Sequence, residues 1–344
     1  MAKISGEEKL AFQGEQLHNR VKKRYRHLKK WAKRTGTDVF RLYDRDIPEI
    51  PLVLDLYGDA VSGSLYKRPY EKDPAEEEVW LGVMAAAVSD ALGIPRDQVF
   101  LKYRERQRGK NQYARMGWQN FERDIHEGAL TFRVNLSDYL DTGFFPDRRQ
   151  MRTRIRSEAP GKTLLNLFCY TAAFSVCAAA AGAAEIDSVD MSRPYLERAA
   201  INFGLNHLET LTVPPEFLIT RQNRRSALPY RLIRADVLPF LEAARKAGLS
   251  WDTIILDPPA FSNSKRMVAT LDIKRDHTSL IMQCLSLLKP EGKLWFSVNA
   301  RHFNLDPAEF SGWEITNLSS CMDDEDFRGK KLPPCYTFTQ TKPL

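Results

Sequence analysis

The stretch Ile254-Ile255-Leu256-Asp257-Pro258-Pro259-Ala260-Phe261-Ser262 decides the fold of this chain. Its apolar start, with two β-branched isoleucines, predicts a buried parallel strand. The two prolines after Asp257 forbid further strand pairing or a helical turn, so the strand ends at a carboxylate and a stiff corner. Because open α/β sheets bind ligands at the carboxyl ends of their strands, Asp257, Pro258 and Phe261 are candidate site residues. An ordinary exit from a strand explains the same residues, so the interpretation depends on the surrounding chain.

Strands and helices are predicted to alternate on both sides of this stretch, from residue 160 onward. The alternation runs through strands at residues 163–168, 185–190, 230–234 and 293–298, helices at 172–181, 193–205, 237–247 and 276–288, and two closing strands at 313–318 and 336–340. This order is typical of the α/β class, with a doubly wound, mainly parallel sheet and right-handed crossovers. The irregular segment 207–225 is predicted to be a loop with little structure of its own.

Acidic residues mark the ends of these predicted strands. Asp190 ends the second strand, roughly twenty residues after the first βα turn, where a carboxylate suits two ribose hydroxyls. Asp236 follows the third strand and suits an adenine amino group, while Val237 offers a backbone N–H to the ring. Each acid taken singly is as easily explained as a helix cap. Three acids at three successive strand ends, with Asp257 as the third, predict a site for S-adenosylmethionine.

The first βα turn, residues 166–173, lacks the G-x-G-x-x-G pattern that lets a backbone approach a pyrophosphate. A cofactor without phosphates is therefore favoured. The candidate cofactor-binding residues in this turn and after the second strand are Asn166, Phe168, Tyr170, Thr171, Met191 and Ser192. Arg148 is a further candidate, because it follows a glycine-bearing loop, where side chains commonly face a ligand.

Residues 137–156 join this part of the chain to the part before it. A turn at residues 142–146 precedes Asp147, which is predicted to cap an arginine-rich helix. We therefore place a domain boundary between residues 136 and 137. A Rossmann-like domain is expected over 137–344 and a smaller α+β domain over 1–136.

The smaller domain is predicted to begin with a basic helix at residues 13–34. One apolar stripe along it is formed by Leu17, Val21, Tyr25, Leu28 and Ala32. The other faces are basic, and no acid follows Glu15 within the helix to neutralise them. Most such charge runs are solvated surface, but the missing acids favour contact with phosphates. The candidates for this contact are Lys22, Lys23, Arg26 and Lys30.

Short strands are predicted for the rest of this domain. Hairpins at residues 53–66 and 121–134 turn at Tyr57-Gly58-Asp59 and Glu127-Gly128. An acidic loop at 71–78 leads into a helix that ends near Gly93.

A basic strand is predicted at residues 102–110, with Tyr103 among its cations. Its candidates for RNA contact are Arg104, Arg106 and Arg108. An exposed edge strand protected by charge explains the same pattern. Nothing in this domain indicates catalysis.

Composition limits the classes of protein that the chain can represent. The 344 residues carry a net charge of +7, which favours a polyanionic partner. Five cysteines without a C-x-x-C pair favour reduced thiols in the cytoplasm and argue against a zinc or iron–sulfur site. No apolar run reaches membrane-spanning length, and the N-terminus is charged rather than a signal peptide. Neither a metal nor a membrane is therefore expected as a partner.

Extended motifs in this sequence match those of a known family. They are Tyr139-Leu140-Asp141-Thr142-Gly143-Phe144-Phe145 with Arg148, Asn166-Leu167-Phe168 with Tyr170-Thr171, Val189-Asp190-Met191-Ser192, Arg234-Ala235-Asp236, Asp257-Pro258-Pro259-Ala260-Phe261-Ser262-Asn263-Ser264-Lys265-Arg266-Met267, Arg275-Asp276-His277 and Phe296-Ser297-Val298-Asn299-Ala300-Arg301. Over its whole length the chain resembles the RlmK-type guanine-N7 methyltransferases of 23S ribosomal RNA. In some bacteria these form the C-terminal half of a fused RlmK–RlmL enzyme.

The resemblance implies a class I S-adenosylmethionine-dependent methyltransferase domain preceded by an RNA-binding domain. The implied partner is 23S ribosomal RNA or a large-subunit assembly intermediate. The sequence departs from the family pattern at Ala172, where glycine is usual, and in the insert after Asn206. Because the chain shows no second methyltransferase half, a coupled guanine-N2 methylation is expected to require a separate methyltransferase chain.

The chemistry of the acceptor atom separates three possibilities. Methylation of cytosine C5 needs a cysteine that adds to the ring. Residues 297–300, where related cytosine methyltransferases carry it, contain none. An exocyclic amine, guanine N2 or adenine N6, stays open, because Asp257 and the Pro258 carbonyl suit its polarisation. Guanine N7 has an in-plane lone pair and no proton, so it needs alignment and a negative field but no general base.

For guanine N7 we expect Asp257 to supply the negative field and Phe261 to stack on the base. Lys265 or Arg266 is expected to hold a neighbouring phosphate. The target base must be unpaired or flipped, because N7 faces the deep, narrow groove of duplex RNA.

Two other classes of protein fit parts of the sequence. A non-catalytic RNA-binding factor with this fold would not need Asp190 or Asp257, and both are present. A small-molecule methyltransferase would not need the basic helix or the basic strand at 102–110.

Overall fold

The computed structural model describes residues 5–66, 73–104, 119–219, 228–262, 270–300 and 303–341. The chain divides into two compact units. The first comprises Met1–Pro146 together with Glu325–Phe327, and the second comprises Asp147–Asp324 together with Arg328–Leu344.

The division after Pro146 falls later than the boundary at 136/137 that the sequence suggests. Residues 137–146 are bound to the first unit by polar contacts. The Thr142 hydroxyl donates to the Tyr57 hydroxyl at 3.0 Å, and the Lys102 ammonium donates to the carbonyl of Tyr139. These contacts keep the turn before Arg148 on the first unit.

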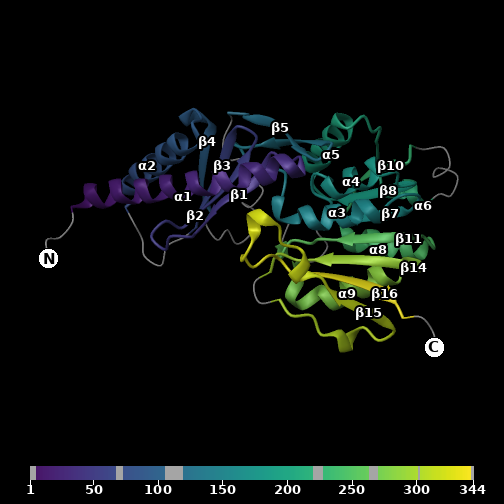
Figure 1. The fold of residues 1–344 in the computed structure, drawn as a ribbon. Helices are drawn as coiled ribbons and strands as arrows, with labels where there is room; N and C mark the ends of the chain where they lie inside the picture. Colours follow the sequence, from purple (N-terminus) through teal and green to yellow (C-terminus); the bar gives the residue numbers. More distant parts are fainter. Residues whose placement is uncertain are drawn as a thin grey trace. The chain divides into compact units, whose positions relative to one another are not determined.

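A four-stranded sheet forms the centre of the first unit (Figure 1). Its strands, in spatial order, are β1 (Val39–Asp44), β2 (Leu52–Tyr57), β3 (Ala60–Tyr66) and β4 (Val99–Arg104). Strands β1 to β3 are antiparallel and β4 runs parallel to β3. The two predicted hairpins are confirmed, the first as β2 and β3 and the second as β5 (Glu122–Glu127) and β6 (Leu130–Asn135).

Two helices pack together in this unit, α1 (Gly6–Thr35) and α2 (Pro74–Leu92). Helix α1 begins at a capping box of Ser5 and Glu8 and ends at Gly36, whose φ is 68°. The predicted apolar stripe is confirmed, because Leu17, Val21 and Leu28 are fully buried in one core with α2 and the sheet.

The predicted acidic loop at 71–78 is wrong in its second half. Asp73 caps α2, and Glu76 and Glu77 lie in the first helical turn. The positive end of the helix dipole favours acids there, so the same residues that resemble a polar loop are good helix starters.

An eight-stranded sheet forms the second unit, in the order β15-β16-β14-β11-β7-β8-β10-β9. Its strands are β7 (Thr163–Leu167), β8 (Glu185–Asp190), β9 (Leu211–Val213), β10 (Tyr230–Arg234), β11 (Trp251–Leu256), β14 (Leu288–Ser297), β15 (Trp313–Asn317) and β16 (Cys335–Gln340). Strands β14 to β9 are parallel, and β16 and β15 are antiparallel to their neighbours. The predicted α/β class with a mainly parallel sheet is confirmed. A short pair, β12 (Phe261–Ser262) and β13 (Leu271–Asp272), lies outside this sheet.

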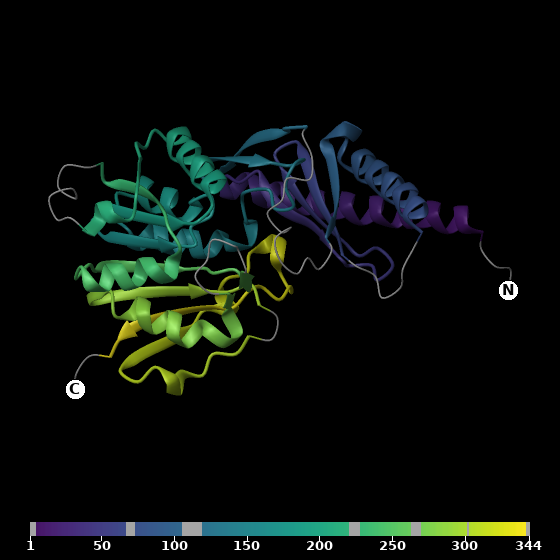
Figure 2. The ribbon, with the colours of Figure 1, turned by 180° about the vertical axis from the view of Figure 1, so that it is seen from behind.

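Helices connect these strands in the predicted alternation. They are α3 (Arg149–Glu158), α4 (Ala173–Ala180), α5 (Arg193–Leu205), α6 (Glu216–Ile219), α8 (Val237–Lys246) and α9 (Ile273–Leu285). The chain moves outward from β7 through β8 to β10, and then returns to β11 on the other side of β7. Right-handed crossovers therefore place α4 and α5 on one face and the neighbouring pair α8 and α9 on the other (Figures 1 and 2). The reversal creates a switch point between β7 and β11, where such sheets bind ligands.

Three local predictions for this unit are corrected. Asp147 does not cap a helix, because a 3₁₀ turn at Pro146–Arg148 precedes α3 and Arg148 occupies the cap position. Segment 207–225 is not simply a loop, since β9 adds an edge strand to the sheet and α6 follows it. Helix α9 begins at Ile273, before the predicted residue 276, because Asp272 caps it.

The five cysteines are all free, and four of them are buried. Within the described ranges, no helix is both long enough and apolar enough to span a bilayer.

Candidate active site

The register of the sheet brings four strand ends to one edge. Arg234 of β10 pairs with Asp190 of β8, and Val189 and Leu256 both pair with Leu167 of β7. Because these strands are parallel and end together, the residues that follow them meet at the carboxyl edge. The structure thus brings Asp190, Asp236, Asp257 and the first βα turn together, as the sequence predicts.

The first βα turn has an unusual backbone. Phe168, Tyr170 and Ala172 have φ values of 54°, 53° and 59°, which is the left-handed region that non-glycine residues rarely adopt. Each such residue costs about 1 kcal/mol or more. At Ala172 this explains why glycine is usual in the family that the sequence resembles. Strain of this kind persists where the surroundings enforce it, and it is concentrated at functional sites.

Asp190 enforces part of that conformation. Its carboxylate accepts hydrogen bonds from the backbone N–H of Tyr170 at 3.0 Å and of Ser192 at 2.8 Å. Burial raises the pKa of Asp190 to about 6, against the opposing effect of hydrogen bonds from Ser192, Tyr170 and Met191. The residue as a whole is only partly buried by surface area.

Asn166 and Thr171 support the turn from beneath. Both are buried; the Asn166 amide donates to the Ser175 hydroxyl at 2.8 Å, and the Thr171 carbonyl accepts from Asn202 at 2.9 Å. The Asn166 side-chain oxygen has no hydrogen-bond partner within the described part of the chain. Phe168 is partly buried and packs against the main hydrophobic core of this unit.

The residues expected at an adenine ring lie at the start of α8. The Asp236 carboxylate accepts from the backbone N–H of Leu238 at 3.3 Å and so caps the helix. Asp236 therefore is a helix cap, as the simpler interpretation of this acid holds. Val237 is buried, Ser192 begins α5, and the Met191 carbonyl accepts from Arg234 at 3.4 Å.

The sequence names both Arg148 and Asp257 but not their pairing. The Arg148 guanidinium donates two hydrogen bonds to the Asp257 carboxylate, at 3.0 and 2.9 Å. Burial alone would lower the pKa of Arg148, but the charges of Asp257 and Asp147 raise it above its ordinary value. The Asp257 side chain keeps 18% of its surface exposed. A charged arginine thus orients a carboxylate that remains partly exposed.

Pro258 is buried directly after this pair, whereas Phe261 is 42% exposed at the start of the short β12. An exposed aromatic ring is available for stacking. The candidates Lys265 and Arg266 lie outside the described residues.

Two residues of this edge were missed by sequence reasoning. The rings of Tyr195, in the first turn of α5, and Tyr170 meet edge-on, with centroids 4.5 Å apart. The sequence signal for Tyr195 is its position as an aromatic residue shortly after Asp190. Cys335 is paired with Ser297 across β16 and β14, at the strand end where no cysteine was expected. Burial raises the pKa of the Cys335 thiol to about 12, with smaller effects from the charges of Arg148 and Asp257.

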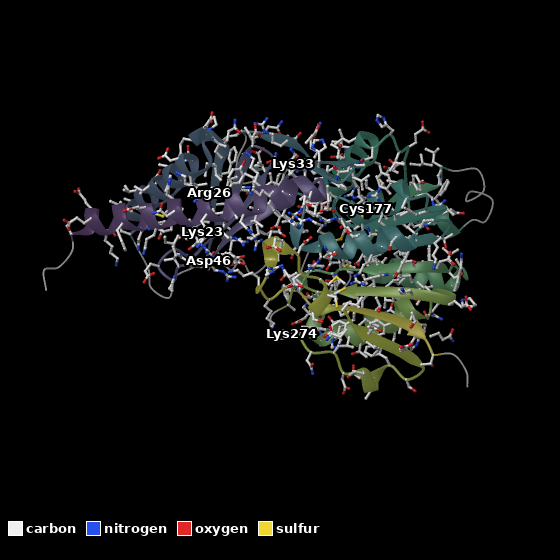
Figure 3. All side chains as sticks on the ribbon, in the orientation of Figure 1. Lys23, Arg26, Lys33, Asp46, Cys177 and Lys274 are labelled. Carbon is white, nitrogen blue, oxygen red and sulfur yellow. The ribbon has the colours of Figure 1, made fainter. Side chains whose placement is uncertain are left out.

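The cations of the basic helix α1 fall into two sets, those with partners in the first unit and those exposed without an acidic partner among the described residues. Arg20 pairs with Asp46 at 2.7 Å, and Arg24 donates to the carbonyl of Asp326 at 3.0 Å. By contrast, the predicted RNA-contacting residues Lys22, Lys23, Arg26 and Lys30 are exposed and have no acidic partner among the described residues. Figure 3 labels Lys23, Arg26 and Lys33 along α1.

The basic strand is less informative. Arg104 ends β4, and Arg106 and Arg108 lie outside the described residues. Lys102 is buried rather than exposed, and burial lowers its pKa to about 8. It holds the turn before Arg148 in place.

The carboxyl edge fits S-adenosylmethionine. It offers the partly buried acid Asp190 and, within the described ranges, a buried Asn166 amide oxygen without a hydrogen-bond partner. The first βα turn has no glycine-rich pattern for phosphates. In the part of the chain that the structure describes, no group of three or more His, Cys, Asp or Glu side chains is placed to hold a metal ion.

Comparison with known proteins agrees with this site. The profile of the S-adenosylmethionine-dependent methyltransferase family matches residues 56–308. A crystal structure of a methyltransferase complexed with S-adenosylhomocysteine superposes with a TM-score of 0.70 at 25% identity, covering 98% of this chain and 83% of that one. The chain belongs to the S-adenosylmethionine-dependent methyltransferases and has their fold.

Two curated relatives define the family more narrowly. Ribosomal RNA large subunit methyltransferase K of Neisseria meningitidis is 41% identical over 92% of this chain and 85% of that protein. The K/L protein of Stutzerimonas stutzeri is 42% identical over 92% of this chain, which spans only 41% of that longer protein. The chain belongs to the family of these large subunit methyltransferases K.

Proposed function

We propose that this protein methylates guanine N7 in 23S ribosomal RNA by direct transfer from S-adenosylmethionine. The names of its relatives support ribosomal RNA of the large subunit as the substrate. The observation that favours direct transfer is the state of Cys335. It is the cysteine on which the charges of Arg148 and Asp257 act, and burial raises its pKa to about 12. A thiol that stays protonated is a poor nucleophile, so a covalent adduct with a pyrimidine ring is disfavoured.

The residues of the carboxyl edge then have separate tasks. S-adenosylmethionine supplies a methyl group on a sulfonium centre. Asp190 accepts from the ribose hydroxyls, while the strained turn 168–172 presents its backbone to the remainder of the cofactor. Asp257, oriented by Arg148, faces the positive charge that builds up on the purine. Pro258 fixes the backbone corner, and Phe261 stacks on the target base.

No residue is required as a general base for this reaction. Guanine N7 carries no proton, and its lone pair lies in the plane of the ring. The site therefore has to align the base and tolerate a cationic product. An open carboxylate whose arginine partner is fixed on one side meets that requirement.

The exposed cations of α1 are proposed to hold the RNA backbone. Lys22, Lys23, Arg26 and Lys30 project from one helix without acidic partners in the described ranges, so phosphates meet little competition there. Arg104, Arg106, Arg108, Lys265 and Arg266 are proposed to extend this contact. The substrate is naked 23S ribosomal RNA or a large-subunit assembly intermediate, in the cytoplasm. A separate guanine-N2 methyltransferase is a further proposed partner, and this chain spans only 41% of the longer K/L relative.

A second acceptor, guanine N2 or adenine N6, is favoured by one feature. Asp257 is followed by two prolines, and the Pro258 carbonyl and a carboxylate together suit an exocyclic amine. Arg148 already occupies a lone pair on each Asp257 oxygen, which weakens this alternative because the carboxylate is less free to accept from an amine. Cytosine C5 is less favoured, and a non-catalytic RNA-binding factor is the remaining alternative.

Mass spectrometry of nucleosides from 23S ribosomal RNA tests the proposal. A strain without this protein is expected to lose 7-methylguanosine at one site. The parent chain and a Cys335→Ser variant should restore it, whereas Asp257→Ala should not. Persistence of 7-methylguanosine together with loss of another mark would show that the acceptor atom is wrong. Unchanged nucleosides would favour the non-catalytic alternative.

Salt dependence tests the RNA-binding face. Replacement of one phosphate-contacting lysine, Lys23→Gln, should lower the slope of log affinity against log salt by about one unit. Lys9→Gln is the matched control, because Lys9 is exposed on the same helix but lies next to Glu7 and Glu8. Equal slopes of log affinity against log salt for the two variants would contradict a phosphate contact by Lys23 of α1.

A further inference from the structure

The chain passes from the second unit to the first between residues 324 and 325. Asp324 belongs to the second unit, while Glu325–Phe327 belong to the first. Asp326 and Phe327 are only 1% and 2% exposed. Asp326 and Phe327 cannot move without breaking their contacts within the first unit.

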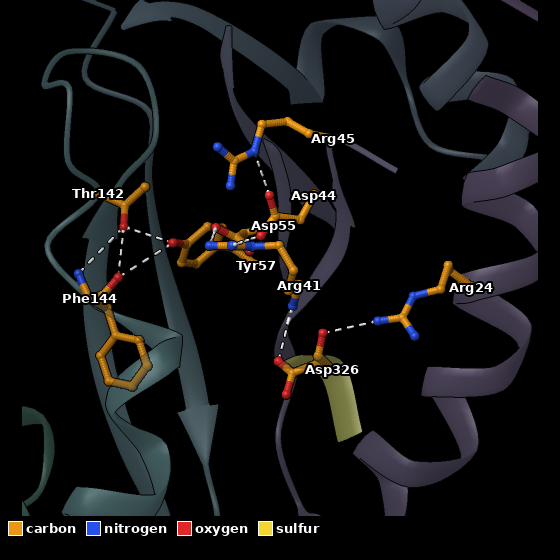
Figure 4. A network of polar contacts seen from close by, with 9 residues as sticks. All are labelled: Arg24, Arg41, Asp44, Arg45, Asp55, Tyr57, Thr142, Phe144 and Asp326. Carbon is orange, nitrogen blue, oxygen red and sulfur yellow. Dashed lines mark hydrogen bonds and ion pairs between the residues drawn. The ribbon is translucent and has the colours of Figure 1, made fainter. Parts of the chain in front are cut away.

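The contacts of Glu325–Phe327 are specific, and Figure 4 shows those of Asp326 with Arg24 and Arg41. The carbonyl of Asp326 accepts from the Arg24 guanidinium at 3.0 Å, and its carboxylate accepts from the backbone N–H of Arg41 at 3.1 Å. The Arg41 guanidinium lies 4.9 Å from the centre of the Phe327 ring. Glu325 also contacts His27 at 2.6 Å. Backbone, charge and ring contacts therefore fix all three residues.

Asp324 itself contacts the start of α3. Its carboxylate accepts from the Gln150 amide at 2.9 Å and from the Arg149 guanidinium at 3.4 Å. Helix α3 has no acid in its first turn, and Arg148 at its cap position makes no side-chain cap bond. Asp324 thus supplies the negative charge that the positive end of this helix favours.

The start of α3 determines where Arg148 lies. Arg148 directly precedes Arg149 and makes both hydrogen bonds to Asp257. A shift in the first turn of α3 would carry the guanidinium with it and turn the Asp257 carboxylate. We propose that Asp324 is a positioning residue for methyl transfer, acting through Arg149 and Gln150 on the Arg148–Asp257 pair. The inference rests on the proposed function.

The matched control for Asp324 is its neighbour. Asp323 is exposed and has no side-chain contact that the structure describes, so Asp323→Asn makes the same change of charge one residue away. We expect Asp324→Asn to lower kcat for methyl transfer from labelled S-adenosylmethionine into 23S ribosomal RNA by up to about 100-fold. The dissociation constant for S-adenosylhomocysteine should stay within about twofold, because Asp190 is untouched. Asp323→Asn should leave both values at the parent level.

A double-mutant cycle tests the route through Arg148. If Asp324 acts through Arg148, then Asp324→Asn should have little further effect on kcat in an Arg148→Ala background. Independent, multiplied losses of kcat would overturn the proposal. So would an Asp324→Asn variant with parent kcat, or one whose cofactor affinity falls as much as its kcat.

A second measurement separates this proposal from the proposed function. Hydrogen exchange of the backbone amides of residues 149–152 should be faster in Asp324→Asn than in Asp323→Asn. If the parent chain transfers no methyl group to 23S ribosomal RNA, the proposed function fails, and the exchange measurement alone decides the positioning role. Equal protection in the two variants overturns it, whatever the activity.

Discussion

Two regions of the same parallel sheet use acidic residues in opposite ways. In the interior of the sheet, Asp187 of β8 is fully buried and both of its oxygens are bound, by Arg231 at 2.6 Å and Trp251 at 2.8 Å. At the carboxyl edge, three residues further along the same strand, the Asp190 carboxylate accepts from backbone N–H groups and the residue is only partly buried. Asp257 at that edge is oriented by Arg148 and is also partly exposed.

The difference separates structural from functional acids. An interior carboxylate whose two oxygens are bound within the protein has little capacity left for a ligand. Removing its charge leaves the buried Arg231 with Glu185, whose side chain is 41% exposed, as its remaining printed acidic contact at 2.7 Å. At the carboxyl edge, two acids are only partly buried and the Asn166 amide oxygen has no hydrogen-bond partner among the described residues. The backbone there is also strained, at Phe168, Tyr170 and Ala172. The carboxyl edge therefore lacks some of the stabilising contacts of the interior, at the place where a cofactor is expected to bind.

The largest expected effect is in the interior. Asp187→Asn should lower the free energy of unfolding by about 3 kcal/mol, because it leaves the fully buried Arg231 guanidinium with the half-exposed Glu185 as its acidic partner. The control is Asp124→Asn, which breaks a two-bond pair with Arg133 that is about one-third exposed. That loss should be at most about 1 kcal/mol. Chemical denaturation measures both, and similar losses would refute the distinction between interior and surface pairs.

At the edge, the same change should affect chemistry more than stability. Asp257→Asn is expected to lower kcat about 100-fold, because it removes the charge facing the developing cation. The free energy of unfolding should fall by only about 1–2 kcal/mol, since the pair is partly exposed and Arg148 keeps Asp147 at 3.5 Å. Steady-state kinetics and denaturation on one preparation check this. A stability loss as large as that of Asp187→Asn with normal kcat would reverse the assignment of the two acids.

Asp190 should make cofactor binding depend on pH. Its pKa is raised from 3.8 to about 6 in the folded protein, so folding favours the protonated form. Its contribution to stability therefore decreases as the pH rises from about 4 to about 6. Binding of the ribose needs the ionised form, so affinity for S-adenosylhomocysteine should be about tenfold weaker at pH 5 than at pH 7.

Isothermal titration calorimetry at several pH values measures that dependence. Asp190→Asn should bind weakly at every pH between 5 and 7. A parent chain with flat affinity across this range would contradict the role given to Asp190.

The smallest expected effect comes from the strained turn. Ala172→Gly relieves a left-handed alanine and should raise the free energy of unfolding by about 0.5–1 kcal/mol after the entropy of the unfolded glycine is included. Ala178→Gly, inside α4, should instead lower it by at least about 1 kcal/mol. Thermal unfolding distinguishes them. If both variants were destabilised equally, the backbone at 172 would not be strained.

Elements with strong local signals were predicted closely. Strand β8, helix α5 and strand β10 match their predicted ranges, because apolar runs, Pro194 and the flanking polar residues all act locally. The candidate acids at the carboxyl edge were found for the same reason, since each lies at the end of a strand or within two residues of it.

Features that depend on distant parts of the chain were not predictable. Arg148 and Asp257 are 109 residues apart, so their pairing exists only in the folded sheet. The same holds for Cys335 opposite Ser297 and for Asp324 at the start of α3. Asp147 was misplaced as a cap because the chain enters α3 through a 3₁₀ turn at Pro146–Arg148, which shifts the cap position to Arg148.

The most direct test of the account is the identity of the methylated nucleoside made by the purified chain. Unmodified 23S ribosomal RNA, incubated with this protein and methyl-labelled S-adenosylmethionine, is digested and separated by chromatography with mass detection. The account predicts label in 7-methylguanosine, lost in Asp257→Asn and retained in Cys335→Ser. Label in 5-methylcytidine that disappears in Cys335→Ser would contradict direct transfer to guanine N7.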